Sequence, residues 1–324
     1  MDNKTIYKRT LGFSIRQLLW DILSVILIGA AMTLGFFITD KAMNNGLVGL
    51  LIGGIVAIIL VAIFSRWVSY TYKAGQIAMM TKGVTENKLP EDVIGEGKKV
   101  VKERFTTVAA YFAVTGVIKG IFRLIGQGIT AVGKAIGGDT GGAVGGTISS
   151  IIETIVSYLC DCCLGWVFYR KDQKASKATM EGAAIFFKHG KTLAKNLGRI
   201  FGISLLSFVV IGGVFFGLSW LIMQAIPDSF STLSAELVEQ FGSDAPAWIS
   251  DPMTLTIVCS AVIGIVMWAI LHSTFIRPFI LVGVLRNFIN SGKDDIPSEK
   301  AIAELDAKIP KVGKYREKLE AKAA

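Results

Sequence analysis

Four stretches of this chain run for at least 18 residues without a charged side chain. They cover residues 22–39, 46–65, 200–226 and 254–276. About 20 apolar residues in a helix cross the hydrocarbon core of a bilayer. Inside lipid the backbone N–H and C=O groups must bond to each other, which favours helices. These runs therefore predict an all-α, polytopic membrane protein.

The composition excludes the main soluble alternatives. Hydrophobic residues make up 52% of the 324 residues and charged residues only 18%, against about 25% charged in a typical soluble domain. A soluble fold of this length needs more polar surface, and a disordered chain needs lower hydrophobicity. The first apolar run is too long for a cleavable signal and is expected to be the first span.

The distribution of Lys and Arg predicts the orientation. Basic residues concentrate in segments 1–17, 66–104, 170–199 and 291–324, whereas loop 227–253 holds five acids and no Lys or Arg. Basic loops stay on the cytoplasmic side. We therefore expect a multi-pass protein of the plasma (inner) membrane with both termini cytoplasmic and 227–253 outside. The net charge of +9 is then a topology signal, and no nucleic-acid partner is expected.

Residues 105–169 permit two topologies, because both flanking segments are predicted to be cytoplasmic. Two crossings give about six transmembrane helices, whereas zero crossings give four spans plus membrane-surface or re-entrant helices. We favour six spans with additional amphipathic interfacial helices. The alternative rests on a polar stripe at helical spacing, made of Lys119, Arg123, Gln127, Thr130 and Lys134.

Three regions follow from these patterns. Residues 1–104 are predicted to form a two-span hairpin and a charged cytoplasmic connector, 105–290 a helical membrane bundle, and 291–324 a cytoplasmic tail. Within the bundle, 174–199 is expected to be a basic amphipathic helix on the inner membrane surface. Its basic residues are expected to contact anionic lipid. They are Lys174, Lys177, Lys188, Lys191, Lys195 and Arg199.

A few ionisable residues lie in or beside the apolar stretches. They are Asp21, Glu153, Asp161 and His272. Such groups are costly in lipid and usually face a cavity or a partner. We expect Glu153, Asp161 and His272 to line a substrate or ion pathway. The alternative places Asp21 at the inner interface and lets Asp161 pair near the inner edge.

Glycines recur four positions apart between residues 133 and 146, and again at Gly49/Gly53 and Gly213/Gly217. This spacing lets helix backbones approach closely. It predicts tight packing within the chain or, alternatively, an oligomer interface or a hinge, so a homo-oligomer is an expected assembly. The helix-packing set is Gly133, Gly137, Gly138, Gly141, Gly142, Gly145 and Gly146.

Motifs for catalysis are missing from the sequence. It holds no P-loop and no H-E-x-x-H, and its only histidines are His189 and His272. We therefore expect no enzyme, no cofactor and no metal. The cluster Cys160, Cys162 and Cys163 is interpreted as small packing residues, because metal sites normally combine spaced ligand pairs from two segments. Palmitoylation is the alternative.

Several short stretches of the second half carry a family resemblance. They are Ser157-Tyr158-Leu159, Ala184-Ile185-Phe186-Phe187, Asn196 with Arg199, and 272–275 through Phe288. Over residues 150–290 the chain resembles the choline transporter-like family, although it lacks that family's large external domain and has about half the usual length. The resemblance implies transport of a cationic alcohol amine such as choline.

Two functions are therefore expected from different classes. The first is a transporter or channel-like protein for a small solute. The second is an oligomeric membrane scaffold or assembly component that binds anionic lipid through the basic helix at 174–199.

Overall fold

The computed structural model describes the backbone of residues 1–137, 142–194, 197–226 and 246–308, with a few positions between 227 and 245. Side chains are described over the same ranges except at 124–155, 187, 190–194, 197–199, 247 and 305–306. These residues are helical and include no strand. The chain divides into two compact units, Met1–Leu197 with Pro278–Ala324, and Gly198–Arg277.

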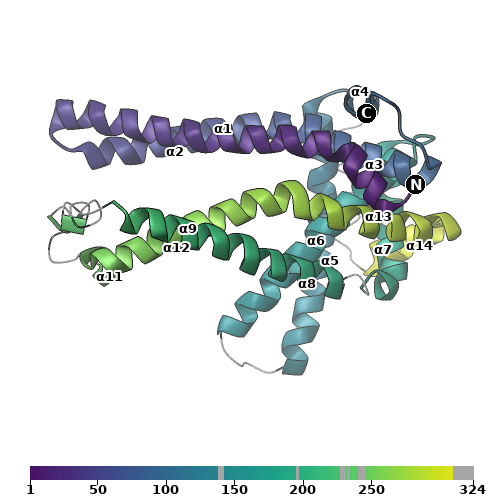
Figure 1. Ribbon diagram of the computed structural model, residues 1–324. Helices are drawn as coiled ribbons and strands as arrows, with labels where there is room; N and C mark the ends of the chain where they lie inside the picture. Colours follow the sequence, from purple (N-terminus) through teal and green to yellow (C-terminus); the bar gives the residue numbers. More distant parts are fainter. Residues whose placement is uncertain are drawn as a thin grey trace. The chain divides into compact units, whose positions relative to one another are not determined.

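The first unit begins with a hairpin of two long helices, α1 (Asn3–Met43) and α2 (Gly46–Val68), which lie side by side (Figure 1). The Asp2 side chain caps α1 by accepting the backbone N–H of Thr5 at 2.9 Å. Asn44 ends α1 in the left-handed conformation, with φ of 54°, and the Asn45 side chain caps α2. The Asn44-Asn45 pair thus makes the tight turn between the two helices.

Glycine brings the backbones of α1 and α2 into direct contact. A Cβ atom on Gly49 would overlap the carbonyl oxygen of Gly35, and a Cβ atom on Gly53 would overlap that of Ala31. Large apolar side chains point away from the hairpin instead. Ile38 is 66% exposed and Leu51 is 62% exposed. A closely packed pair with an apolar outer surface is suited to lipid.

The second span continues well beyond its apolar part. A π-helical turn, η1 (Ser69–Lys73), and α3 (Ala74–Glu86) prolong α2 into one helix over Gly46–Glu86. Residues 74–81 are all buried, and α3 ends at Asn87, where φ is 55°. The first half of the predicted connector at 66–104 is therefore helical. It then turns into α4 (Val93–Arg104), which the Asp92 side chain caps.

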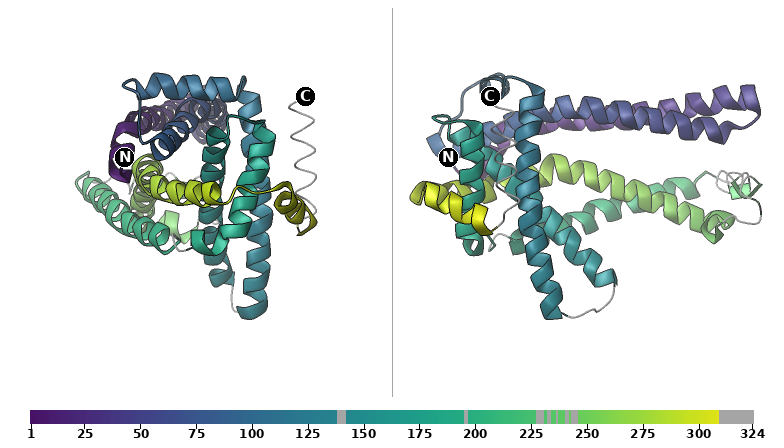
Figure 2. Two further views of the ribbon diagram at one scale, coloured as in Figure 1. Left: turned by 90° about the vertical axis from the view of Figure 1, so that its right-hand side faces the viewer. Right: turned by 180° about the vertical axis from the view of Figure 1, so that it is seen from behind.

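A second hairpin of the first unit consists of α5 (Val108–Gly137) and α6 (Gly142–Tyr169). It runs crosswise to the α1–α2 hairpin (Figures 1 and 2). The first half of α5 is amphipathic, with Lys119 and Arg123 exposed and Ile121 and Phe122 buried, as the polar stripe predicts.

Four helices are long and apolar enough to cross a membrane. They are Asn3–Met43, Gly46–Glu86, Ile200–Gln224 and Pro252–Asp294. A fifth is possible if Val93–Arg104 and Val108–Arg123, which meet at a bend of 80°, form one span. About six transmembrane helices are expected from the sequence, and the described residues account for four or five of them. Lys119 and Arg123 in α5, and the short apolar part of α6, account for the difference.

The helical body of the first unit is completed by α7 (Ala175–Ala194), α13 (Arg277–Asp294) and α14 (Glu299–Lys308). Residues 178–185 of α7 are all buried. The predicted basic helix at 174–199 therefore needs correction, since α7 packs within the body and α8 begins at Leu197. The largest fully buried side chains of the chain include Trp166, Tyr158, Phe13, Phe105, Phe122 and Phe288.

The second unit contains α8 (Leu197–Ser207), the π-helical η2 (Phe208–Gly212), α9 (Gly213–Gln224), α11 (Ala247–Ser250), α12 (Pro252–Leu271) and the π-helical η4 (His272–Ile276). Helices α9 and α12 pack against each other. Asp251 caps α12 by accepting the N–H groups of Met253 and Thr254, and Pro252 occupies the first turn. Of the 27 residues of the predicted external loop 227–253, 12 lie outside the described residues.

Candidate functional site

Asp161 lies in the helical body of the first unit, where it forms an ion pair with Lys73. Lys73 Nζ is 3.1 Å from Asp161 Oδ1, and the two side chains are 33% and 7% exposed. A buried carboxylate keeps its charge only beside a partner such as this ammonium. Because Lys73 is the last residue of η1, the pair ties the continuation of α2 to α6.

Aromatic rings from four elements pack beside this junction. Tyr70, in η1, donates its hydroxyl to the carbonyl oxygen of Phe105 at 2.9 Å. Its ring centroid is 5.6 Å from that of Tyr111 in α5, and the rings of Phe105 and Phe168 are 5.7 Å apart. Edge-to-face rings of this kind add packing energy beyond their buried area. The π-helical turn is thus anchored by packing as well as by charge.

A second buried acid, Glu181 in α7, is also fully engaged. Its Oε2 atom accepts the indole N–H of Trp166 at 3.0 Å and lies 3.7 Å from Arg170 Nε. Glu181 lies in the segment 174–199, which the sequence predicts to be a surface helix, and neither Arg170 nor Lys73 is among the predicted site residues. The apolar neighbours of Glu181, including Ile185, were the available signal that its side chain is buried.

Arginine 104 binds the chain just after α6 ends. Arg104 Nη1 donates to the carbonyl oxygen of Gln173 at 2.7 Å, and Nη2 donates to that of Arg170 at 3.0 Å. Carbonyl groups at a helix C-terminus lack intrahelical partners, and a guanidinium can satisfy two of them. Arg104 therefore joins the end of α4 to the turn between α6 and α7.

The N-terminal part of α1 is held to the body by further polar contacts. Gln76 Nε2, in α3, donates to the Thr10 carbonyl oxygen at 3.3 Å and to Ser14 Oγ at 2.8 Å, and these contacts are buried. Arg286, in α13, donates to Asn3 Oδ1 at 2.6 Å and to the Met1 carbonyl oxygen at 2.7 Å. The polar groups of the first unit therefore serve to join its helices.

The cysteine cluster is part of the same packed body. All three cysteines, Cys160, Cys162 and Cys163, are buried and reduced. The Cys163 thiol donates a hydrogen bond to the carbonyl oxygen of Thr179, with Sγ 3.5 Å from that oxygen. Burial, together with the neighbouring Cys160, raises the pKa of the Cys163 thiol. Among the described residues, no group of three His, Cys, Asp or Glu could hold a metal ion.

The second unit holds a separate polar cluster around His272. His272 Nε2 is 3.0 Å from Ser204 Oγ. The neighbouring Trp268 donates its indole N–H to Ser207 Oγ at 3.2 Å, and its ring centroid is 5.2 Å from that of His272. These contacts bridge α8 and the end of α12. Imidazole and hydroxyl groups in this arrangement can exchange a proton or orient a polar solute.

Polar side chains of both units coincide with π-helical turns. Lys73 ends η1, Ser207 directly precedes η2, and His272 begins η4. A π-helical turn inside an α-helix is rare and frequently marks a functional position. It therefore distinguishes these three residues from the other polar residues of the long helices.

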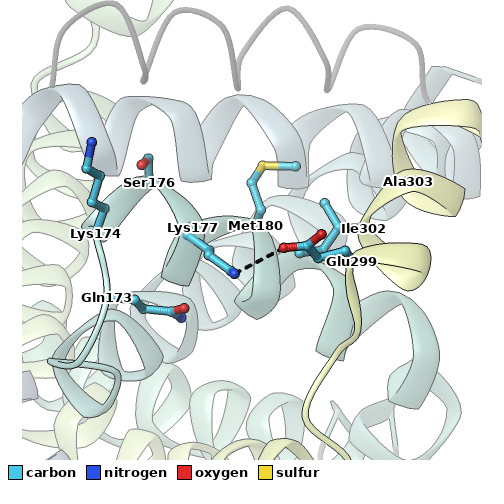
Figure 3. A pocket seen from close by; sticks show the side chains of 8 residues that line it. All are labelled: Gln173, Lys174, Ser176, Lys177, Met180, Glu299, Ile302 and Ala303. Atoms are coloured by element: carbon cyan, nitrogen blue, oxygen red, sulfur yellow. Dashed lines mark hydrogen bonds and ion pairs between the residues drawn. The ribbon is translucent and has the colours of Figure 1, made fainter. Parts of the chain in front are cut away.

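A groove of about 880 Å³ opens between the start of α7 and α14. Figure 3 shows Lys177 reaching across it to Glu299, 3.3 Å away, with Met180 and Ile302 along its apolar part. Farther along α7, Lys188 pairs with Asp295. Two of the basic residues predicted to contact lipid therefore pair with acids of the C-terminal region instead. The exposed Lys174 lines the same groove.

The predicted pathway residues do not all fall in one unit. Asp161 belongs to the first unit and His272 to the second. The side chains of Glu153, Lys191, Lys195 and Arg199, and the packing around the glycine set at 133–146, lie outside the described residues. The pathway and helix-packing predictions for them therefore stay predictions. By contrast, Gly49 and Gly53 do form the close helix contact that their spacing predicts.

Comparisons with protein-family models, with curated proteins and with solved structures find no match to this chain. The resemblance of the second half to the choline transporter-like family therefore stays a prediction.

Proposed function

We propose that this protein is a membrane-anchored helical scaffold whose body is held at the cytoplasmic face of the bilayer. The proposal rests on one observation: the buried charges of the first unit pair with each other and join its helices. Lys73 and Asp161, 3.1 Å apart, neutralise each other beyond the apolar part of α2. A charge that fastens helices together is poorly suited to binding a passing solute, because each partner already satisfies the other.

Packing of the α1–α2 hairpin supports the same function. Gly35 and Gly49 place the two backbones in contact, so this pair leaves no room for a path between its helices. At the inner end, Trp20 donates its indole N–H to Ser65 Oγ at 2.9 Å. Exposed Arg66 and Trp67 follow, and aromatic and basic residues of this kind anchor a span at the membrane surface.

Anionic lipid is the partner that we propose for the amphipathic part of α5. Lys119 and Arg123 are exposed on one face of this helix, and no ion pair involves them among the described residues. Because α5 runs crosswise to the α1–α2 hairpin, both side chains can approach a membrane surface together. Each basic residue near an anionic surface contributes about 1 kcal/mol.

Lipid retention in detergent tests the scaffold proposal. The variant Lys119→Ala/Arg123→Ala is expected to retain about half as much phosphatidylglycerol per protein, measured by native mass spectrometry. A matched control, Lys88→Ala/Lys102→Ala, removes two exposed basic residues from the α3–α4 region of the same unit. This control should retain as much phosphatidylglycerol as the wild-type protein. Equal retention by both variants would contradict the proposed lipid contact.

The His272 cluster favours transport of a small solute as a second candidate function. It places an imidazole and two hydroxyl groups on long apolar helices of the second unit. Proteoliposomes assayed for proton and choline flux test this candidate. Flux that is lost in His272→Ala and kept in Gly217→Ala, at an open position of α9, supports it. The absence of flux in the wild-type protein supports the scaffold instead.

A further inference from the structure

A cavity of about 320 Å³ lies in the body of the first unit, separate from the groove in Figure 3. Its walls come from α3, α4, the end of α6, the turn after α6, and α13. Apolar and aromatic side chains, including Met79, Val100 and Phe168, form part of the lining. The polar part consists of Thr81, Thr85, Glu86 and three lysines, Lys82, Lys171 and Lys293.

The charges around this cavity are unbalanced. Three ammonium groups face one lining carboxylate, Glu86. Lys82 is partly neutralised by Glu96, 3.1 Å away. Lys171 and Lys293 are exposed and take part in no ion pair among the described residues, although Lys293 Nζ lies 5.2 Å above the ring of Tyr169. Two lysines therefore remain available to an anion.

This arrangement differs from that of the other lysines near the C-terminal region. Lys177 and Lys188 each pair with an acid there, Glu299 and Asp295 respectively. The charges of Lys177 and Lys188 are thus neutralised by neighbouring carboxylates, whereas Lys171 and Lys293 at the cavity have no carboxylate partner among the described residues. Lysine is a common ligand for phosphate groups, which it binds as a point charge.

The cavity is far from the apolar part of the membrane hairpin. Lys82 lies 16 residues beyond Arg66 on the continuous helix Gly46–Glu86. At a rise of 1.5 Å per residue this separation is about 24 Å. Arg66 is the first charged residue after the uncharged run 46–65, so the cavity is out of reach of a lipid headgroup that stays in the bilayer. Its ligand is therefore expected to be dissolved in water.

We infer that this cavity binds the phosphate group of a small, water-soluble organic molecule. Lys171 and Lys293 bind the phosphate oxygens, and the apolar and aromatic wall holds the uncharged part of the ligand. The volume falls in the range of small-molecule sites, about 300–1,000 Å³, which is larger than a bare phosphate needs. A free organic phosphate and a lipid headgroup share this chemistry, and the 24 Å separation favours the free form.

Isothermal titration of the full-length protein in nanodiscs tests this inference, with inorganic pyrophosphate as the probe. The wild-type protein is expected to bind pyrophosphate at millimolar concentrations or below. The variant Lys171→Ala/Lys293→Ala should weaken binding by about tenfold or more. The control Lys88→Ala/Lys102→Ala should change it by less than about twofold. Glu86→Gln removes the opposing carboxylate and should tighten binding, a gain that damage to the fold would not produce.

Comparing two nanodisc compositions identifies the source of the phosphate. Equal pyrophosphate affinity in phosphatidylcholine discs and in discs containing phosphatidylglycerol supports a water-soluble ligand. Weaker binding in the anionic discs would mean that a lipid headgroup competes, and would overturn the assignment to a soluble ligand. Absence of wild-type binding, or equal losses in the lysine pair and the control pair, would overturn the site itself.

Discussion

The two apolar hairpins of this protein are held together in different ways. In α1–α2 the backbones touch at Gly35 and Gly49, and Thr39 Oγ1 accepts the N–H of Gly49 beside this contact. In the second unit, α12 also approaches a neighbouring backbone closely, at Gly264 beside Gly212. Its C-terminal end adds polar side-chain contacts, as Trp268 donates to Ser207 and His272 lies 3.0 Å from Ser204. Lipid offers no hydrophobic force to associate helices, so close packing and interhelical hydrogen bonds are the available means.

This difference separates a hairpin suited to anchoring from one that carries groups able to bind a solute or a proton. Contacts between glycine backbones hold two helices at one distance and carry no group that could bind a solute or a proton. The cluster of His272, Ser204 and Ser207 adds such groups, and each hydrogen bond within a membrane is worth only about 0.6 kcal/mol on average. The predictions below test this division.

Substitution of Gly49 by Leu should have the largest effect. The new side chain would collide with the backbone of α1 at Gly35, so the helices must separate, at a cost of about 3 kcal/mol or more. We expect a large drop in the thermal unfolding temperature in detergent, followed by circular dichroism. Gly29→Leu is the matched control, because a Cβ atom there has nothing within 4 Å. An equal drop in both variants would refute the glycine contact.

Removal of Lys73, which lies where α2 continues beyond the hairpin, should have the next largest effect on stability. Lys73→Ala leaves Asp161 buried without its ammonium partner, and we expect a loss of about 2 kcal/mol because Lys73 is itself partly exposed. The double variant Lys73→Met/Asp161→Leu removes both charges and should recover much of this loss. Chemical denaturation of the three proteins measures the recovery, and no recovery would show that the pair is not the cause.

Changes to the second hairpin should be milder. Ser204→Ala removes one hydrogen-bond partner of His272 and should lower stability by about 1 kcal/mol or less. His272→Ala should cost a similar amount, and the double variant should cost little more than either single variant, because both remove the same bond. Unfolding in detergent tests this non-additivity. Fully additive losses would show that the two side chains do not interact.

The smallest change is expected in the rate of thiol labelling at Cys163, which tests whether this residue is buried in the helical body. The raised pKa of Cys163 keeps its thiol protonated where an ordinary cysteine forms thiolate. Between neutral pH and pH about 9, labelling by N-ethylmaleimide should accelerate at an introduced Lys88→Cys and hardly at all at Cys163. Peptide mass spectrometry gives both rates. Rapid labelling of Cys163 in the folded protein would contradict its burial.

Much of the fold could be predicted from the uncharged runs alone. The all-α class and the four long apolar helices agree with the structure. The number of further spans could not be predicted in the same way. A helix that packs on other helices and one that crosses lipid are both apolar on most of their surface. The apolar run 105–118 is therefore compatible with either, and its sequence does not distinguish a span from a packed helix.

Prediction of the site was limited for a different reason. Asp161 stood out because its neighbours in the sequence are apolar, but its partner Lys73 is distant in the chain and lies in a segment rich in other charges. Glu181 was hidden by the lysines around it, since periodicity shows that residues share a helix face and not what that face meets. The cavity at Lys171 and Lys293 depends on five separate elements, and no local pattern contains it.

The continuous helix over Gly46–Glu86 has a mechanical consequence. A rigid rod that passes from lipid into water acts as a lever, because the membrane sets the angle of one end and the body follows at the other. Helices tilt in response to bilayer thickness, and a tilt of about 10° would displace a point about 24 Å along the rod by about 4 Å. A tilt of this helix would therefore move α3, which forms one wall of the lysine-lined cavity.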